Sequence, residues 1–416
     1  MRKHPKGLYV LFFTELWERY SFYSMMAILS LYMNESLHFD VAHVGRIYGL
    51  YTAGVYFLPL FGGLLADRVL GFNRAVIAGG VLMMFGHLVL GVEALPFFFT
   101  GLVLLASGSG LLKPNLSTLV GNLYRDRPEL RDQGYSIYYM GINIGGFISP
   151  ITVAWIRMHY GYSPAFMSAA VAMVISLAVY IFFNRHLRDA ARNVDDTAAS
   201  ATAVSSSDAR QRVITLLIVF VISTVFWLAW YQIFYTFTFW ARDNVSTGIA
   251  PEQFSSFESF GVIVFTPLIV TFWAWLMRRN LEPSTPVKML MGLGLLAIAF
   301  SILGTGSLAG GDTGRVTSTW LITANLIMAF GEIALSPIGM SLVNRLAPPR
   351  QRGLLMGAWF VSLATGGYLA GRIGVFWDRV PHHQFFFGVA ATLVIVGLPL
   401  SFLTPQIKRT IARAEA

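Results

Sequence analysis

Twelve long apolar stretches follow one another along the chain, separated by short polar segments. Each stretch reaches the length of about 20 residues that a helix needs to cross the hydrocarbon core of a bilayer, and none shows the alternation of a transmembrane strand. Only 12% of the residues are charged, against about a quarter in soluble domains, which excludes a soluble globular domain and a disordered chain. We predict an all-α integral membrane protein with twelve transmembrane helices, at 8–33, 43–66, 74–93, 96–121, 134–156, 163–184, 213–241, 254–277, 286–307, 317–345, 352–376 and 383–404.

The basic residues indicate how these helices cross the membrane. With both termini in the cytoplasm, 22 of the 30 Lys and Arg residues fall in inside segments, and few fall in outer loops: Arg157, Arg242, Arg315 and Arg379. Cytoplasmic loops carry such an excess, so the net charge of +9 reflects membrane topology rather than binding to nucleic acid. We expect a multi-pass protein of the cell inner (plasma) membrane whose N-terminal segment is retained as the first helix and not cleaved as a signal peptide.

The chain divides into two similar parts. The stretch 189–212, rich in Ala, Ser and charged residues, reads as a solvated linker between six helices and six helices. Pro114 precedes a Gly-Gly pair by 31 residues in the first part, and Pro337 precedes another by 29 residues in the second. Internal similarity of this kind is typical of the major facilitator fold, in which the substrate site lies between the halves. We predict an N-terminal half at 1–186, a cytoplasmic linker at 187–212 and a C-terminal half at 213–416.

A few ionisable residues interrupt the predicted helices, and most of them gather in one group. The spacing of Glu15, Glu18 and Arg19 places them along one face of the first helix. Lys113 in the fourth helix lies at the same depth as Glu15, roughly 12 Å from the cytoplasmic side at 1.5 Å per residue, so the two side chains can meet. Charged residues inside a membrane usually face a cavity and work there, which favours a proton or substrate relay. The alternative is an ion-pair network that only holds helices together.

Two further carboxylates lie in the C-terminal half. Glu332 is 15 residues into the tenth predicted helix, close to the middle of the membrane, where an intramembrane acid is expected to be functional. Glu258 is nearer the outer end of the eighth helix, so it either contributes to a site or extends to water.

The motifs around these charges resemble those of one family. Residues 15–23, ELWERYSFY, resemble the ExxERFxYY motif of the proton-coupled oligopeptide transporter (POT) family, and residues 135–145, YSIYYMGINIG, resemble its fifth-helix signature. Both motifs are highly specific, and the similarity covers nearly the whole chain. It continues through Lys113-Pro114-Asn115, Phe226-Trp227, Gly331-Glu332, Ser336-Pro337-Ile338-Gly339 and Trp359-Phe360.

The resemblance implies a binding site for di- and tripeptides and uptake driven by the proton gradient. Proton coupling and the peptide carboxylate are assigned to Glu15, Glu18, Arg19 and Lys113. Peptide contacts are assigned to Tyr23, Tyr56 and Asn143, the peptide amino group to Glu332, and the pocket walls to Trp227 and Trp359. Tyr231 and Glu258 complete the candidate substrate-binding residues. The residue chemistry agrees, because a zwitterionic peptide needs cations at one end and an anion at the other.

Several positions depart from the family pattern or stand outside the substrate site. Met26 and Tyr231 occupy the positions of the family's outer gate ion pair, and losing both together leaves no lone buried charge. We expect a contact between methionine and an aromatic ring there instead. Glu258 occupies a position where the family usually has Asn. Asp67 and Arg68 end a loop sequence that resembles the major facilitator loop motif, and we expect them to brace helix ends as a gate.

The sequence therefore predicts a proton-coupled symporter that imports small zwitterionic peptides by alternating access and works as a monomer in the lipid bilayer. The alternative is a transporter of the same family that moves a modified peptide, an amino acid or another solute, possibly outward. An enzyme is not expected, because HExxH, P-loop and GxSxG motifs are absent. Without a single Cys, and without clustered ligands, we expect no cofactor and no metal.

Overall fold

The structure is a computed structural model that describes residues 4–127, 130–191, 206–347 and 352–415. Within these residues, eleven helices are long and apolar enough to cross a membrane. The remaining long helix is α1 (Lys6–Glu35), which has 30 residues but carries charged residues in its middle. The predicted all-α membrane fold is confirmed, and the difference of one span from the expected twelve has a simple cause. The acidic and basic residues of α1 lower its mean hydropathy.

The chain forms two compact units. The first consists of Met1–Phe39 and Gly54–Asp195, and the second of Asp40–Ala53 and Asp196–Ala416. The short segment Asp40–Ala53 therefore groups with the second unit, although it lies inside the predicted N-terminal half. Its glycines explain this, because a Cβ atom added to Gly45 would lie 2.6 Å from the carbonyl oxygen of Gly371. Helices approach this closely only where side chains are absent.

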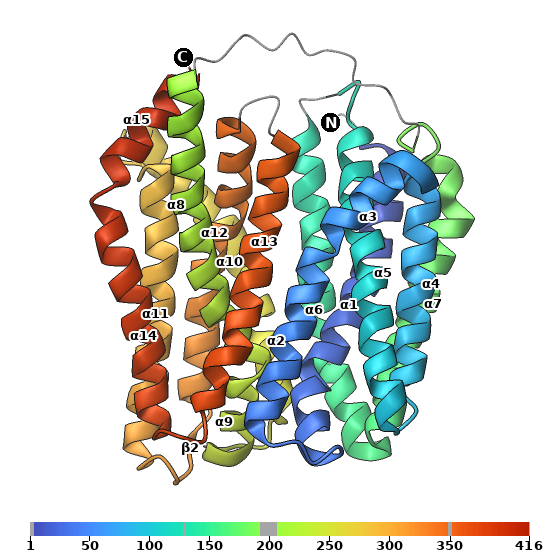
Figure 1. The fold of residues 1–416 in the computed structure, drawn as a ribbon, viewed down its shortest axis with the longest axis vertical. Coiled ribbons are helices and arrows are strands. Elements are labelled where there is room, and N and C mark those ends of the chain that lie inside the picture. Colours follow the sequence, from blue (N-terminus) through green and yellow to red (C-terminus); the bar gives the residue numbers. More distant parts are fainter. Residues whose placement is uncertain (1–3, 128–129, 192–205, 348–351, 416) are drawn as a thin grey trace. The chain divides into compact units, whose positions relative to one another are not determined.

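The first unit contains seven α-helices, wholly or in part, and two short helical turns (blue to green in Figure 1). Helix α1 packs against α6 and α7, and α4 packs against α5 and α7. The elements are α1, the end of α2 (Val41–Phe57), α3 (Pro59–Leu65), the π-helix η1 (Ala66–Leu70), α4 (Phe72–Leu90), α5 (Leu95–Asn122), α6 (Arg131–Tyr160), α7 (Tyr162–Phe183) and η3 (Asn184–His186).

The second unit is helical apart from one pair of very short strands. Helix α11 packs against α12 and α14, α8 against α13, and α10 against α12, while β1 pairs in parallel with β2. Its described elements are the start of α2, α8 (Ser206–Trp230), η4 (Tyr231–Phe234), α9 (Thr236–Asn244), β1 (Val245–Ser246), η5 (Pro251–Phe254), α10 (Ser255–Arg278), α11 (Thr285–Ala309), β2 (Val316–Thr317), α12 (Thr319–Leu346), α13 (Arg352–Ile373), η7 (Gly374–Phe376), α14 (His382–Ser401) and α15 (Thr404–Glu415).

Two predicted helices are interrupted. The second ends at Phe57, continues as α3 from Pro59 and closes as a π-helical turn before Gly71, whose φ of +74° favours glycine. The seventh ends at Trp230 and passes through a 3-10 turn at Tyr231–Phe234 into α9. In that turn the Gln232 side-chain amide donates to the carbonyl oxygen of Ala370 at 3.1 Å, so a contact on α13 holds a backbone that the apolar run alone would have continued as one α-helix.

The sequence predicts no helix after residue 404, but the structure has a C-terminal helix there, α15. Ile407 and Ile411, one turn apart, are both buried, while the nearby basic side chains Lys408, Arg409 and Arg413 are exposed. Helix α15 packs with this apolar face against α8, α11 and α12. The segment is therefore an amphipathic helix of the second unit.

A polar cluster centred on Asp312, in the loop after α11, joins the end of α11 to the start of α14. Asp312 accepts hydrogen bonds from the Ser307 hydroxyl at 2.6 Å, from the His383 backbone N–H at 2.9 Å, and from the ring Nδ1 of His383 at 2.5 Å. Burial opposes ionisation of this carboxyl, but the hydrogen bonds favour the carboxylate and hold the pKa of Asp312 below its ordinary value.

We predict that Asp312→Asn lowers the free energy of unfolding by about 1.5–3 kcal/mol at neutral pH, because hydrogen bonds to a carboxylate are replaced by weaker ones. A carboxyl whose pKa is lowered by folding stabilises the protein above its unfolded pKa, and that stability is lost as the pH falls through the folded value. Thermal unfolding in detergent from neutral pH to about pH 3 should show the variant and the wild type converging in acid. The exposed Asp126→Asn serves as a control, and a constant difference at every pH would contradict the assignment.

Candidate functional site

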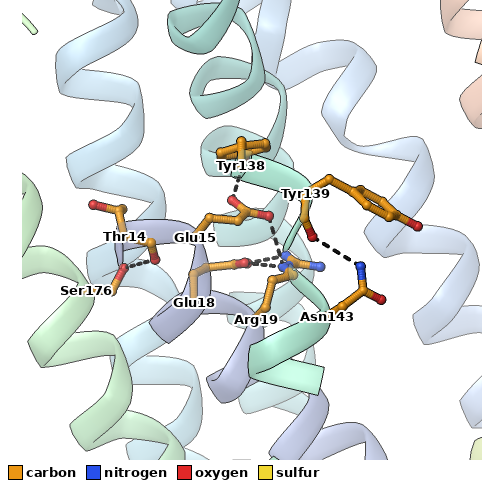
Figure 2. Close-up of polar contacts among 8 residues, drawn as sticks. All are labelled: Thr14, Glu15, Glu18, Arg19, Tyr138, Tyr139, Asn143 and Ser176. Carbon is orange, nitrogen blue, oxygen red and sulfur yellow. Dashed lines mark hydrogen bonds and ion pairs between the residues drawn. The ribbon is translucent and has the colours of Figure 1, made fainter. Parts of the chain in front are cut away.

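Three charged side chains of α1 are buried together in the first unit (Figure 2). Glu15, Glu18 and Arg19 are each at most 2% exposed. The guanidinium group of Arg19 donates to both carboxylate oxygens of Glu18, and its Nε atom lies 3.3 Å from Oε1 of Glu15. The structure thus brings together the three residues whose spacing defined one helix face. One guanidinium group faces two carboxylates, so the group has an excess negative charge unless it binds a proton or another cation.

Helix α6 contributes a tyrosine that the sequence analysis did not single out. The Tyr138 hydroxyl donates a hydrogen bond to Oε2 of Glu15 at 2.6 Å (Figure 2). Helix α6 lies this close to α1 because a Cβ atom on Gly145 would be 2.6 Å from the Leu16 carbonyl oxygen, and one on Gly141 would be 3.0 Å from that of Phe12. A signal was present in the sequence, since positions 138, 141 and 145 share one helix face.

Two buried polar contacts fix α1 from other sides. The Ser176 hydroxyl on α7 donates to the carbonyl oxygen of Thr14 at 2.7 Å, next to Glu15 in the sequence (Figure 2). The Ser21 hydroxyl lies 2.6 Å from Nε2 of His87 on α4. Neither contact was predicted, because serine, threonine and a single histidine in a helix carry no distinctive sequence pattern.

Lys113 on α5 does not form the expected ion pair with Glu15. Its ammonium group lies 4.3 Å from the centre of the Tyr56 ring and 5.3 Å from that of Phe22, in cation–π geometry. It has no salt-bridge partner among the described residues, although it lies within electrostatic range of the acidic residues of α1. The physical reason is that Arg19 already occupies both carboxylates. Lys113 is therefore a second cation beside the acidic group and is held by aromatic rings.

The remaining substrate candidates of the first unit lie on the same two helices. Tyr23 is half-buried on α1, one turn beyond Arg19. Asn143 is buried on α6, and its side-chain amide donates to the carbonyl oxygen of Tyr139 at 3.1 Å (Figure 2). Asn143 lies five residues beyond Tyr138 and between Gly141 and Gly145, so α6 carries both polar side chains close to the motif glycines.

The predicted gate residues belong to different elements of the two units. Met26 is buried on α1 of the first unit, and Tyr231 is buried in η4 of the second unit. Asp67 and Arg68 are exposed in η1 and form no hydrogen bond or ion pair with any residue that the structure describes. The bracing role of Asp67 and Arg68 and the contact at Met26 stay predictions.

In the second unit, two carboxyl groups lie side by side. Glu258 on α10 and Glu332 on α12 are 4% and 8% exposed, and their side chains interact directly. The Ser259 hydroxyl lies 3.3 Å from Oε2 of Glu258, and Trp230 lies next to the same carboxyl group. Of the two alternatives for Glu258, extension of its side chain to water is wrong. The carboxyl group is buried beside Glu332 of α12.

Aromatic side chains surround this part of the second unit. The ring of Trp227 lies 5.2 Å from that of Trp230 and 5.6 Å from that of Tyr231. Trp359 is 1% exposed on α13, and the Tyr231 carbonyl oxygen accepts a hydrogen bond from the Tyr48 hydroxyl at 2.9 Å. Trp230 joins the predicted residues, and its signal in the sequence is a spacing of one turn from Trp227.

Long apolar helices that bury carboxylates together with cations define a membrane transport protein, since such charges are costly in hydrocarbon unless they serve a pathway. Comparison with known proteins shows which family of transport proteins the chain belongs to. The profile described as "POT family" matches residues 73–202 and 186–393. The chain belongs to the POT family, and it is a transporter rather than an enzyme.

Individual relatives resemble the chain over nearly its whole length. YclF, an uncharacterized transporter of Bacillus subtilis, is 31% identical over 98% of this chain and 95% of its own length. The peptide transporter YePEPT of Yersinia enterocolitica is 30% identical over 89% of this chain and 88% of its own. A crystal structure of a peptide transporter POT in complex with sulfate superposes with a TM-score of 0.90 at 30% identity, covering 98% of this chain and 96% of that one.

We predict that Arg19→Met lowers the free energy of unfolding by about 3–5 kcal/mol, because two buried carboxylates lose their guanidinium partner. The triple variant Glu15→Gln, Glu18→Gln, Arg19→Met should recover most of this loss, since no lone charge remains. Intrinsic tryptophan fluorescence during denaturation in detergent measures both variants. If the triple variant were as unstable as the single one, the loss would come from packing and not from charge.

Proposed function

We propose that the chain imports di- and tripeptides across the inner membrane together with protons, by alternating access. The observation that carries the proposal is the buried group on α1, where one arginine serves two carboxylates. Related chains that are named peptide transporters support the substrate class. A buried group with excess negative charge accepts a proton more readily than a balanced pair, which is the property that a symporter needs.

Proton binding promotes substrate binding at this group. Tyr138 and Arg19 both contact Glu15, so protonation of Glu15 frees part of the hydrogen-bonding capacity of the guanidinium group. A peptide carboxylate is then the natural anion to replace it, because guanidinium binds carboxylates in bidentate geometry. Lys113 offers that carboxylate a second cation, which its aromatic neighbours hold without neutralising its charge.

The other end of the peptide is assigned to the second unit. Glu332 accepts the peptide amino group, and Trp227 and Trp359 provide apolar surface for its side chains. Tyr23, Tyr56 and Asn143 offer hydrogen bonds to the peptide backbone. These assignments rest on the burial and chemistry of each side chain and on the family motifs that contain them.

The proposal includes the setting of the protein. The excess of Lys and Arg in alternate loops supports cytoplasmic N- and C-termini in an inner membrane. We propose that the chain works as a monomer in the lipid bilayer, with protons and a small zwitterionic peptide as its only required partners.

Purified protein in liposomes tests the proposal as a whole. Substrate-dependent quenching of an enclosed pH-sensitive dye, under an imposed proton gradient, should follow di- and tripeptides. Amino acids and amine drugs belong in the same screen. If amino acids or amines moved protons and peptides did not, the peptide assignment would be wrong. Accumulation of substrate only when the proton gradient is reversed would indicate export.

We predict that Lys113→Ala reduces proton-driven accumulation by about tenfold or more, while exchange of substrate across the membrane continues. Loss of one charge interaction worth about 1.4 kcal/mol shifts a protonation equilibrium tenfold, which uncouples proton release from substrate binding. Lys288→Ala is a matched control, because Lys288 also lies over an aromatic ring, that of Trp273 at 4.7 Å. Wild-type accumulation by Lys113→Ala would exclude it from coupling.

We predict that Glu332→Gln weakens binding of peptides with a free amino group by about tenfold to a hundredfold, the equivalent of one charged hydrogen bond. Binding of the same peptides with an acetylated N-terminus should change little. Competition against a labelled peptide in detergent measures both. An equal loss for free and acetylated peptides would remove Glu332 from this role.

A further inference from the structure

The contact between Glu258 and Glu332 is built into the packing of two helices. Gly261 lies three residues after Glu258 on α10, and Ala329 lies three residues before Glu332 on α12. A Cβ atom on Gly261 would be 2.7 Å from the Cβ atom of Ala329, so the helices touch within one turn of both acids. Farther along, the rings of Phe265 and Phe330 stack at 4.1 Å between centroids. The packing of the two helices therefore holds the two acids within reach of each other.

Few hydrogen-bond donors surround the carboxyl group of Glu258. The Ser259 hydroxyl lies 3.3 Å from Oε2 and Trp230 lies next to the same carboxyl group, while Oε1 is buried without a donor among the described residues. Two carboxylates buried side by side repel each other, and a buried acceptor without a donor is costly. A single proton bound between the two groups removes one charge and supplies the missing donor.

The elements packed against Glu258 bring further acids. Helix α12 carries Glu332 and, at its far end, the exposed Arg345, while η5 carries the buried Glu252. Tyr231 follows Trp230 and begins η4. Glu258 forms no ion pair with a basic residue in the described part of the chain. A proton or a bound cation can therefore balance the charge of Glu258.

We propose that Glu258 and Glu332 form a second proton-binding site of this transporter, in which the two carboxyl groups share one proton when no substrate is bound. The consequence for coupling rests on the proposed peptide transport. When the ammonium group of a peptide binds to Glu332, the O–H bond of the pair breaks and the proton leaves to water. The ammonium group then balances the charge that the proton balanced before. Position 231, occupied here by Tyr, is not needed for this exchange.

The site itself can be tested without a substrate. Infrared difference spectra of the purified protein across a pH change report the carbonyl band of protonated carboxyl groups. Glu258→Gln and Glu332→Gln should each remove the same component of that band, because the proton belongs to the pair. Glu282→Gln is the control, since Glu282 is exposed and paired with Lys288 at 2.5 Å and should leave the component unchanged. A spectrum that is unchanged in both pair variants overturns the site, and either variant suffices if the other fails to fold.

The coupling step is tested separately. In weakly buffered detergent solution, dialanine should release about one proton more per bound peptide from the wild type than from Glu258→Gln, while N-acetyl-dialanine should show no such difference. If the infrared test succeeds and the release does not differ, the pair exists but the exchange is wrong. If dialanine does not bind at all, the peptide assignment fails and the infrared result stands alone. A gain in affinity for lysine-containing peptides that depends on Glu258, with no protonated band, would mean two ionised carboxylates that select cations, and would also overturn the proposal.

Discussion

Arg19 is buried between Glu18 and Glu15, and the polar architecture of the first unit depends on that contact. A guanidinium group without water must have its donors satisfied within the protein, and leaving one partner unpaired costs several kcal/mol. Both carboxylates of α1 therefore contact Arg19, and Tyr138 on α6 donates a hydrogen bond to Glu15. Because Arg19 already pairs with both acids, Lys113 does not form an ion pair with them. The result is one guanidinium group shared by two carboxylates, with Lys113 within electrostatic range as a second cation.

The second unit buries two acidic side chains without an arginine between them. It places Glu258 and Glu332 together without a basic partner for Glu258 among the described residues, so a proton or a substrate cation must do what Arg19 does in the first unit. The resemblance to the family predicts Asn at position 258, so the second acid of this pair is a departure of this chain from the family pattern.

Both charge groups are positioned by small residues. Helices in a bilayer gain little from burying apolar side chains against one another, since lipid tails are equally apolar, so close contact depends on residues that let backbones approach. Gly145 brings Tyr138 to Glu15, and Gly261 with Ala329 brings Glu258 to Glu332. These residues carry no chemistry, yet they decide which side chains share a proton or a substrate.

The sequence by itself determined the membrane class, the helices and the face of α1 that carries Glu15, Glu18 and Arg19, because hydropathy and three- and four-residue spacing act within a single helix. The family could also be read from its motifs. Only the tertiary structure decided that Lys113 binds aromatic rings and not Glu15, that Tyr138 joins the group, and that the helix after Trp230 breaks. Those outcomes depend on which side chains of different helices make the more favourable contact. The spacing of residues along one helix contains no information about such contacts between helices.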